Sequence, residues 1–261
     1  MAAVAEDAEP LRRSAQLRQA FLQAVVSRRQ VKRGDAEAIL AALREVAAPD
    51  APAPRLDDVV EATNAELARV GLEVRSCNDE RSAAPYYVLV NTKADIFAEL
   101  ATPYTPLELA YIKAVIEAIF TAPDAQFSVS STHALRLAAQ LQPTPMTKRA
   151  ASELLRSLEL RGWLGHSRST GRLFLTLRTL KELDTYLRSE FENQVLQCIV
   201  CYELVTAGAR CATDGCRAAV HDACRVRSED VTACPECNAP WAPLPVGEAR
   251  PESSDGELAD P

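Results

Sequence analysis

Seven of the eight cysteines in this chain of 261 residues, and one of its three histidines, lie in a single segment of forty residues. The spacing reads C-x2-C-x9-C-x4-C-x4-H-x2-C-x9-C-x2-C. Thiolates and imidazole nitrogens are ligands that zinc prefers, and eight of them close two tetrahedral sites with no open position. Closed sites are structural, so the pattern predicts two Zn2+ ions that hold this segment together. The predicted ligands are Cys198, Cys201, Cys211, Cys216, His221, Cys224, Cys234 and Cys237.

An alternative is a set of redox-active or buried core cysteines. That alternative is disfavoured because three pairs of potential ligands have the two-residue gap that lets a tight turn aim both at one ion. Few apolar residues lie between the ligands, so the segment cannot build a core of its own. Metal binding is therefore expected to supply most of its folding free energy, about 10 kcal/mol per site.

The spacing alone allows two ways of sharing the eight ligands between two ions. Sequential pairing would give the first four ligands to one ion and the last four to the other. In interleaved pairing the ligands of the first zinc would be Cys198, Cys201, His221 and Cys224. Those of the second zinc would be Cys211, Cys216, Cys234 and Cys237. The interleaved arrangement resembles the cross-brace of RING and PHD modules.

Cysteine at the fourth ligand and histidine at the fifth is the C4HC3 order, which PHD fingers and variant RING domains share. PHD fingers usually carry an aromatic residue two positions before the seventh ligand, where this chain has Thr232, so a PHD-type chromatin reader is disfavoured. RING domains that bind a ubiquitin-conjugating enzyme usually have an aliphatic residue after the first ligand and a proline after the seventh. Ile199 and Pro235 match. Asn238 stands where many active RING domains have a basic residue, which predicts a ligase activity that is weak or depends on a partner.

The rest of the chain must position this segment, and its composition favours helices over sheets. Hydrophobic residues make up 48% of the chain and aromatic residues only 5%. Apolar residues recur at helical spacing in "LRQAFLQAVVSRR", "DAEAILAALREVA" and "LDDVVEATNAELARVG", and two strand patterns follow, "LEVRSC" and "PYYVLVNT". Three short helices followed by a hairpin are typical of a winged-helix domain, which we predict for residues 16–98.

Residues 99–193 repeat this order. Thr105, Pro106 and Glu108 form a capping signature at the start of the first helix. Two further helices are predicted in "STHALRLAAQL" and "TKRAASELLRSLELRG", and a hairpin follows whose second strand runs to Leu177. A closing helix, "LKELDTYLRSEF", leads into the cysteine segment. This block predicts a second winged-helix domain.

The predicted fold is mainly α with small β wings: tandem winged-helix domains followed by a C-terminal zinc-binding RING-like (C4HC3) domain at residues 194–245. Residues 1–15 are predicted to be a disordered start, and the acidic stretch 246–261 a disordered tail. No window approaches the eighteen apolar residues of a membrane span, and the start has no apolar signal region. We therefore expect a soluble intracellular protein with no membrane partner.

Two winged-helix patterns followed by a C4HC3 module resemble the non-SMC element 1 family, the RING-bearing subunit of the structural-maintenance-of-chromosomes complex devoted to DNA repair. The likeness covers residues 17–241 and is most specific in "NTKADIFAELATPYTPLELAYIKAVIEAIF" and "CPECNAPW". It implies a RING-type E3 ubiquitin ligase that acts in DNA repair and recombination in the nucleus. It also implies that the winged helices dock a MAGE-type winged-helix subunit, which the family pairs with a kleisin subunit.

A RING ligase forms no covalent ubiquitin intermediate, so the resemblance implies no catalytic residue in this chain. The docking surface for the ubiquitin-conjugating enzyme is expected at Ile199, Pro235 and Trp241. The alternative is a non-catalytic zinc and winged-helix adaptor that binds DNA or proteins without transferring ubiquitin. Asn238 is compatible with that alternative.

The chain carries a net charge of −7, so nucleic acid would have to meet a local basic face. The third helix and the wing of the second winged helix provide one, because basic residues outnumber acidic ones there. Positive charge on such a helix and wing suits phosphate contacts, and it is equally compatible with a solvated face or a surface for a partner protein. The candidate DNA-contact residues are Lys148, Arg149, Arg156, Arg168 and Arg172.

Overall fold

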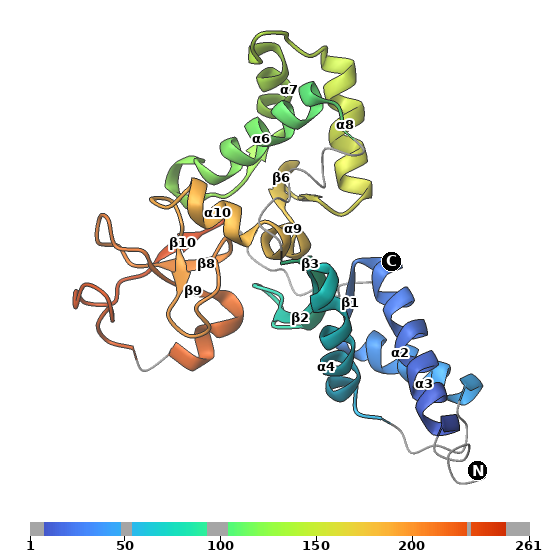
Figure 1. Ribbon diagram of the computed structural model, residues 1–261. Helices are drawn as coiled ribbons and strands as arrows, with labels where there is room; N and C mark the ends of the chain where they lie inside the picture. Colours follow the sequence, from blue (N-terminus) through green and yellow to red (C-terminus); the bar gives the residue numbers. More distant parts are fainter. Residues whose placement is uncertain (1–7, 48–53, 93–103, 229–230, 249–261) are drawn as a thin grey trace. The chain divides into compact units, whose positions relative to one another are not determined.

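The computed structural model describes residues 8–47, 54–92, 104–228 and 231–248 (Figure 1). The chain divides into two compact units, Met1–Ile96 and Phe97–Pro261. The predicted boundary between the two winged helices, at residues 98 and 99, lies outside the described residues.

The first unit has the element order of a winged helix. Its elements are α2 (Ala8–Arg28), β1 (Gln30–Lys32), α3 (Arg33–Ala47), α4 (Leu56–Leu67), η1 (Ala68–Val70), β2 (Leu72–Asn78) and β3 (Pro85–Asn91). The strands form an antiparallel sheet in the order β1-β3-β2, with Val31 opposite Tyr87 and Val74 opposite Leu89. The helices bury one apolar stripe against this sheet, in which Phe21 and Val25 of α2 are fully buried.

A polar cluster joins α3, α4 and β3 of this unit. Arg33 donates hydrogen bonds to both carboxylate oxygens of Asp57, at 3.0 and 2.8 Å. The Tyr87 hydroxyl donates to Asp57 Oδ1 at 2.7 Å. These bonds, first that from Arg33 and then that from Tyr87, lower the pKa of Asp57 to about 2. Burial, followed by the bond to Asp57, raises the pKa of Tyr87 to about 12.

The second unit begins with the same order of elements. They are α6 (Pro106–Phe120), η2 (Pro123–Ala125), β4 (Val129–Ser130), α7 (Ser131–Gln140), α8 (Lys148–Leu160), β5 (Leu164–His166) and β6 (Arg172–Leu175). The sheet order, β4-β6-β5, matches that of the first unit. Thr105 and Glu108 form the predicted capping box at the start of α6, and Thr147 caps α8.

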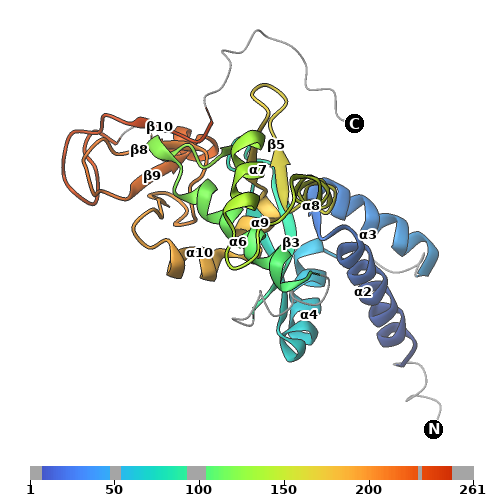
Figure 2. The same cartoon turned by 90° about the horizontal axis from the view of Figure 1, so that it is seen from above.

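Two short helices and a second, larger sheet complete this unit. The remaining elements are α9 (Leu177–Glu182), α10 (Asp184–Glu190), β7 (Gln197–Cys198), β8 (Gly208–Arg210), β9 (Ala218–His221), η3 (Asp222–Ser228) and β10 (Leu244–Val246). The strand order is β10-β8-β9-β7, and Figure 2 shows β10, β8 and β9 beside one another. The pair β7 and β9 is parallel, and the other pairs are antiparallel. This sheet carries the cysteine segment, which we call the metal module, residues 197–248.

The predicted fold class is confirmed: the structure is mainly helical with small sheets, and two winged helices precede a RING-like module. Two short strands, β1 and β4, were not predicted, because two or three residues show no alternation in the sequence. The predicted closing helix is two helices, since Leu183 (φ −96°, ψ 5°) interrupts it. Leu177 begins α9 rather than ending a strand, because the Thr176 side chain accepts a hydrogen bond from Thr179 N and starts the helix there.

Both predicted disordered ends are partly wrong. Helix α2 begins at Ala8, inside the stretch 1–15, and the proline at position 10 falls in the first turn, where a missing N–H breaks no helical hydrogen bond. Val246 is buried, since β10 closes one edge of the sheet and pairs Val246 with Gly208. The rest of the predicted tail, residues 249–261, lies outside the described residues.

None of the helices in the described part of the chain is both long and apolar enough to cross a membrane.

Acid should weaken the first unit through Asp57. The folded-state pKa of about 2 is below the ordinary 3.8, so the contacts of Asp57 stabilise the fold above about pH 4, and this stabilisation disappears as the pH falls from 4 towards 2. We expect Asp57→Asn to lower the melting temperature at pH 7 and to have a diminishing effect in that acidic range.

Asp58→Asn is the matched control, because Asp58 lies in the same first turn of α4 and experiences the same helix dipole. Melting temperatures of both full-length variants and the wild type, measured between pH 2 and 7, test this prediction. Equal effects of the two substitutions at every pH would contradict it.

Candidate metal centre and docking surface

The structure sorts the eight predicted ligands into two groups of four. The first group is Cys198, Cys201, His221 and Cys224, and the second is Cys211, Cys216, Cys234 and Cys237. Within each group the ligand atoms lie within 4.8 Å of one another. This is the interleaved arrangement, and the sequential one is excluded by the geometry.

The distances inside both groups fit a tetrahedral ion. With Zn–S bonds of about 2.3 Å, two thiolates on one zinc lie roughly 3.8 Å apart. Cys211 Sγ lies 3.7 Å from Cys237 Sγ, and Cys216 Sγ lies 3.6 Å from Cys234 Sγ. In the first group His221 Nδ1 lies 3.3 Å from Cys201 Sγ and 3.8 Å from Cys224 Sγ. Both donor sets therefore fit Zn2+ without rearrangement of the backbone.

Two matching turns aim the cysteine pairs of these groups. We call residues 198–203 the first knuckle and residues 234–239 the second. In the first, Tyr202 N donates to Cys198 O (2.9 Å) and Cys198 N donates to Glu203 O (3.0 Å). In the second, Asn238 N donates to Cys234 O (2.9 Å) and Cys234 N donates to the carbonyl five residues on (2.8 Å). The repeated pattern holds each pair of thiols on one side of its turn.

The fifth residue of each knuckle is left-handed: Tyr202 (φ 62°) in the first and Asn238 (φ 57°) in the second. Asparagine adopts this conformation readily, which gives a structural reason for Asn238 where many RING domains carry a basic residue. Tyrosine does so at a cost of about 1 kcal/mol. The Tyr202 residue is also 69% exposed, so the cost is not offset by burial of its ring.

A hydrogen bond fixes the ring of His221. Its Nε2 lies 2.8 Å from Leu204 O, and because a carbonyl only accepts, Nε2 must carry the proton. Nδ1 is then left as a lone-pair donor facing Cys201 and Cys224. A backbone partner of this kind sets both the tautomer and the orientation of a metal-binding histidine.

In each group one thiol has a lowered pKa and another has a raised pKa. Burial raises the pKa of Cys198, but hydrogen bonds that include those from the backbone N–H groups of Cys201, His221 and Val200 outweigh it and lower the pKa to about 6, whereas burial raises the pKa of Cys201. In the second group the Thr213 hydroxyl, 3.5 Å from Cys237 Sγ, lowers the pKa of Cys237 to about 6, and burial raises that of Cys216. A cation bound between the thiols of a group would favour their thiolate forms, which are the forms that ligate a metal.

The predicted docking residues border the second group. Ile199 and Trp241 are partly buried and pack against the apolar cluster of Cys211, Ala218 and Cys234. Pro235 is exposed in the second knuckle, next to Cys234. Ile199 N donates to Ala219 O at 2.8 Å, which fixes the first knuckle against β9.

The five candidate DNA-contact residues have different environments. Lys148, Arg149 and Arg156 are exposed on α8, and Arg168 is exposed in the turn between β5 and β6. Arg172 instead donates from Nε to Ser128 Oγ (2.8 Å) and from a terminal nitrogen to Ser128 O (2.6 Å). Its guanidinium thus fastens β6 to the segment before β4, and four of the five residues remain as an accessible basic face.

Sequence reasoning missed the residues that surround the first group. Leu204 supplies the carbonyl for His221, and Glu203 pairs with Lys181 of α9 at 2.8 Å. The position of Tyr202, directly after the second cysteine of a C-x2-C pair, was a usable signal for the left-handed turn. No local pattern connects position 181 with position 203.

Two winged helices followed by an interleaved C4HC3 metal module define a winged-helix protein with a RING-like module. The family described as "Nse1 non-SMC component of SMC5-6 complex" matches residues 18–183, more than half of the chain, and the chain belongs to that family. The matched span runs from within α2 through the second winged helix and α9, and it ends before the first predicted ligand.

Relatives and a solved structure agree with this assignment. The "Non-structural maintenance of chromosomes element 1" of Schizosaccharomyces pombe is 28% identical over 72% of this chain and 77% of its own length. The Homo sapiens homolog is 27% identical over 85% of this chain and 82% of its own length. A chain in a solved "Nse1-Nse3-Nse4 complex" superposes with a TM-score of 0.76 at 25% identity, covering 87% of this chain and 96% of that one.

Cobalt(II) spectroscopy should reveal the interleaved grouping. We call a site of three cysteines and one histidine the mixed site and a site of four cysteines the all-cysteine site. The two differ in their d–d absorption, because thiolate and imidazole are different donors. We expect Cys201→Ser to remove the signature of the mixed site and Cys234→Ser to remove that of the all-cysteine site. Sequential pairing would reverse these two results, so the pair of variants in the full chain, compared with the wild type, decides between the groupings.

Proposed function

We propose that this chain is a RING-type E3 ubiquitin ligase subunit of the SMC5-6 complex. The observation that carries the proposal is the interleaved metal module, in which Ile199 and Trp241 pack beside the second ligand group, on a chain of the Nse1 family. Two Zn2+ ions are the metals that the donor sets and distances favour.

In this function the chain acts by positioning. Bound zinc would hold the two knuckles in place. Ile199, Pro235 and Trp241 would bind the ubiquitin-conjugating enzyme, whose thioester carbonyl is attacked by the amine of a substrate lysine while its cysteine thiolate leaves. No residue of this chain forms a bond to ubiquitin, so its contribution is the orientation of the two reactants.

The winged helices are proposed to assemble with Nse3 and Nse4, the MAGE-type and kleisin partners expected from the resemblance. The chain's match to 96% of a chain in the Nse1-Nse3-Nse4 complex supports this assembly. DNA repair and recombination in the nucleus is the setting that follows from the family. Ligase activity is proposed to depend on the assembled partners, as the absence of a basic residue after Cys237 indicates.

Ubiquitin discharge from a charged conjugating enzyme onto free lysine tests the ligase proposal. We expect zinc-loaded chain to accelerate discharge when the partners are present, and Ile199→Ala to reduce the rate at least tenfold, because truncation of a central docking residue weakens binding of the enzyme.

Leu244→Ala is the matched control. Leu244 is an exposed aliphatic residue in β10, which forms one edge of the sheet. The opposite edge is β7, which ends at Cys198, next to Ile199 in the sequence. No discharge across a broad panel of conjugating enzymes, from folded and zinc-loaded protein with its partners, would favour the non-catalytic adaptor instead.

A second candidate function is DNA contact through the second winged helix. DNA contact is favoured by four exposed basic residues on α8 and in the turn between β5 and β6: Lys148, Arg149, Arg156 and Arg168. Replacing Lys148 and Arg156 by Ala should weaken DNA binding and reduce the slope of log K against log salt by about 2, since each phosphate contact contributes about 0.9. Arg69→Ala, in the first unit, serves as the control. An unchanged slope would show that this face does not contact DNA.

A further inference from the structure

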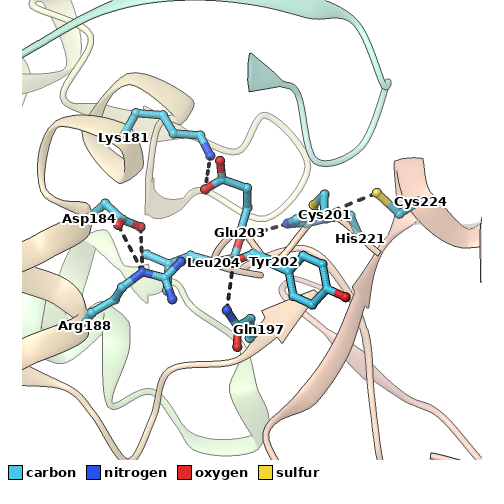
Figure 3. A network of polar contacts seen from close by, with 10 residues as sticks. All are labelled: Lys181, Asp184, Arg188, Gln197, Cys201, Tyr202, Glu203, Leu204, His221 and Cys224. Atoms are coloured by element: carbon cyan, nitrogen blue, oxygen red, sulfur yellow. Dashed lines mark hydrogen bonds and ion pairs between the residues drawn. The ribbon is translucent and has the colours of Figure 1, made fainter. Parts of the chain in front are cut away.

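Lys181 of α9 is buried in the second unit and has a carboxylate partner in the metal module. Its side chain is 9% exposed, and its Nζ lies 2.8 Å from Glu203 Oε2 (Figure 3). A lysine at this depth needs an opposite charge, because an unpaired ammonium would keep the full cost of desolvation. The neighbouring Glu182 is occupied at 2.6 Å by Arg178. Glu203 is therefore the group that balances Lys181.

Glu203 lies beside the first metal group and contacts it through its backbone. It lies two residues after the ligand Cys201, and its backbone carbonyl accepts the N–H of Cys198 at 3.0 Å. The next carbonyl, that of Leu204, accepts the proton of His221 Nε2 at 2.8 Å. A contact that fixes Glu203 therefore also restrains three of the four predicted ligands. Cys198 is restrained through its hydrogen bond, Cys201 through the chain, and His221 through the adjacent carbonyl.

The same short stretch receives two more contacts from outside the knuckle. Tyr202 O accepts hydrogen bonds from Gln197 Nε2 at 3.0 Å and from Arg188 of α10 at 3.4 Å. Arg188 is itself held by Asp184 at 3.0 Å. In Figure 3 Arg188 reaches the knuckle from α10, whereas Gln197 reaches it from β7.

The two knuckles differ in how much outside support their sequences require. The left-handed residue of the second is Asn238, which adopts this conformation readily. The left-handed residue of the first is Tyr202, which does not. A knuckle with an unfavourable residue at this position gains most from contacts that hold its backbone.

We propose that Lys181 is a positioning residue for the first metal group and acts through Glu203 and Leu204 on the orientation of His221. Helix α9, which follows the second winged helix, thereby supports the first site, whereas the contacts of the second site lie within the metal module. This inference rests on the proposed binding of two metal ions.

The test uses the full-length chain loaded with cobalt(II), in which the mixed site and the all-cysteine site are followed separately by their absorption during titration with a chelator. We expect Lys181→Met and Glu203→Gln each to weaken the mixed site about tenfold, the lower end of the range for outer partners of metal ligands, and to leave the all-cysteine site unchanged. Lys113→Met, an exposed lysine on α6, is the control and should change neither site.

Lys181→Arg keeps the charge and should keep the metal affinity of the mixed site. The inference is overturned if Lys181→Arg loses as much as Lys181→Met, if both sites weaken equally, or if Glu203→Gln has no effect. Glu203 is 39% exposed and can be hydrated, so Lys181→Met leaves no buried charge unpaired and gives a folded variant even where Glu203→Gln, which leaves the Lys181 ammonium without its partner, is unstable. A wild-type chain that fails to load two metals would refute the metal proposal itself, which the wild-type titration shows before any variant is compared.

Discussion

The apolar cluster beside the second ligand group consists of Cys211, Ala218 and Cys234, and two of these three residues are themselves ligands. The module also buries Leu204, Val205, Val220 and Val246, but these few side chains still bury little apolar surface compared with the conformational entropy of ordering the module. Interleaved ligation of two metal ions would supply the missing constraint. One group connects the first knuckle to His221 at the end of β9, and the other connects Cys211, after β8, to the second knuckle. Every strand of the module is thus held by a ligand, a hydrogen-bonded neighbour or both.

The two winged helices have the same order of elements and the same sheet order, yet only the second is followed by α9 and α10. These helices bring buried charge to the boundary with the metal module. Arg178 stacks on Trp163 at 4.4 Å and pairs with Glu182, while Lys181 pairs with Glu203. Gly247 N also donates to Ala125 O, so β10 is joined to η2. The metal module therefore has contacts with its winged helix at both ends of its sequence.

Much of this arrangement could be predicted from the sequence because its signals are local. The ligand spacing defined the donor set, and the capping residues Thr105 and Glu108 marked the start of α6. What the sequence could not provide depends on contacts between distant residues. The spacing left two pairings open, and only the placement of the strands selects one. Arg172 has the same charge as Arg168, and only Ser128, brought close by the sheet, distinguishes their roles.

The connection between α9 and the first knuckle bears on how a ligase of this kind could depend on its partners. Ile199, the proposed docking residue, lies between the ligands Cys198 and Cys201, and Glu203 ends the same knuckle. A partner that binds the second winged helix and stabilises α9 would also restrict the backbone that presents Ile199. Restricting a surface before it binds lowers the entropic cost of binding. The winged helix would then influence ubiquitin transfer without touching the conjugating enzyme, through one buried ion pair and the backbone of a single turn.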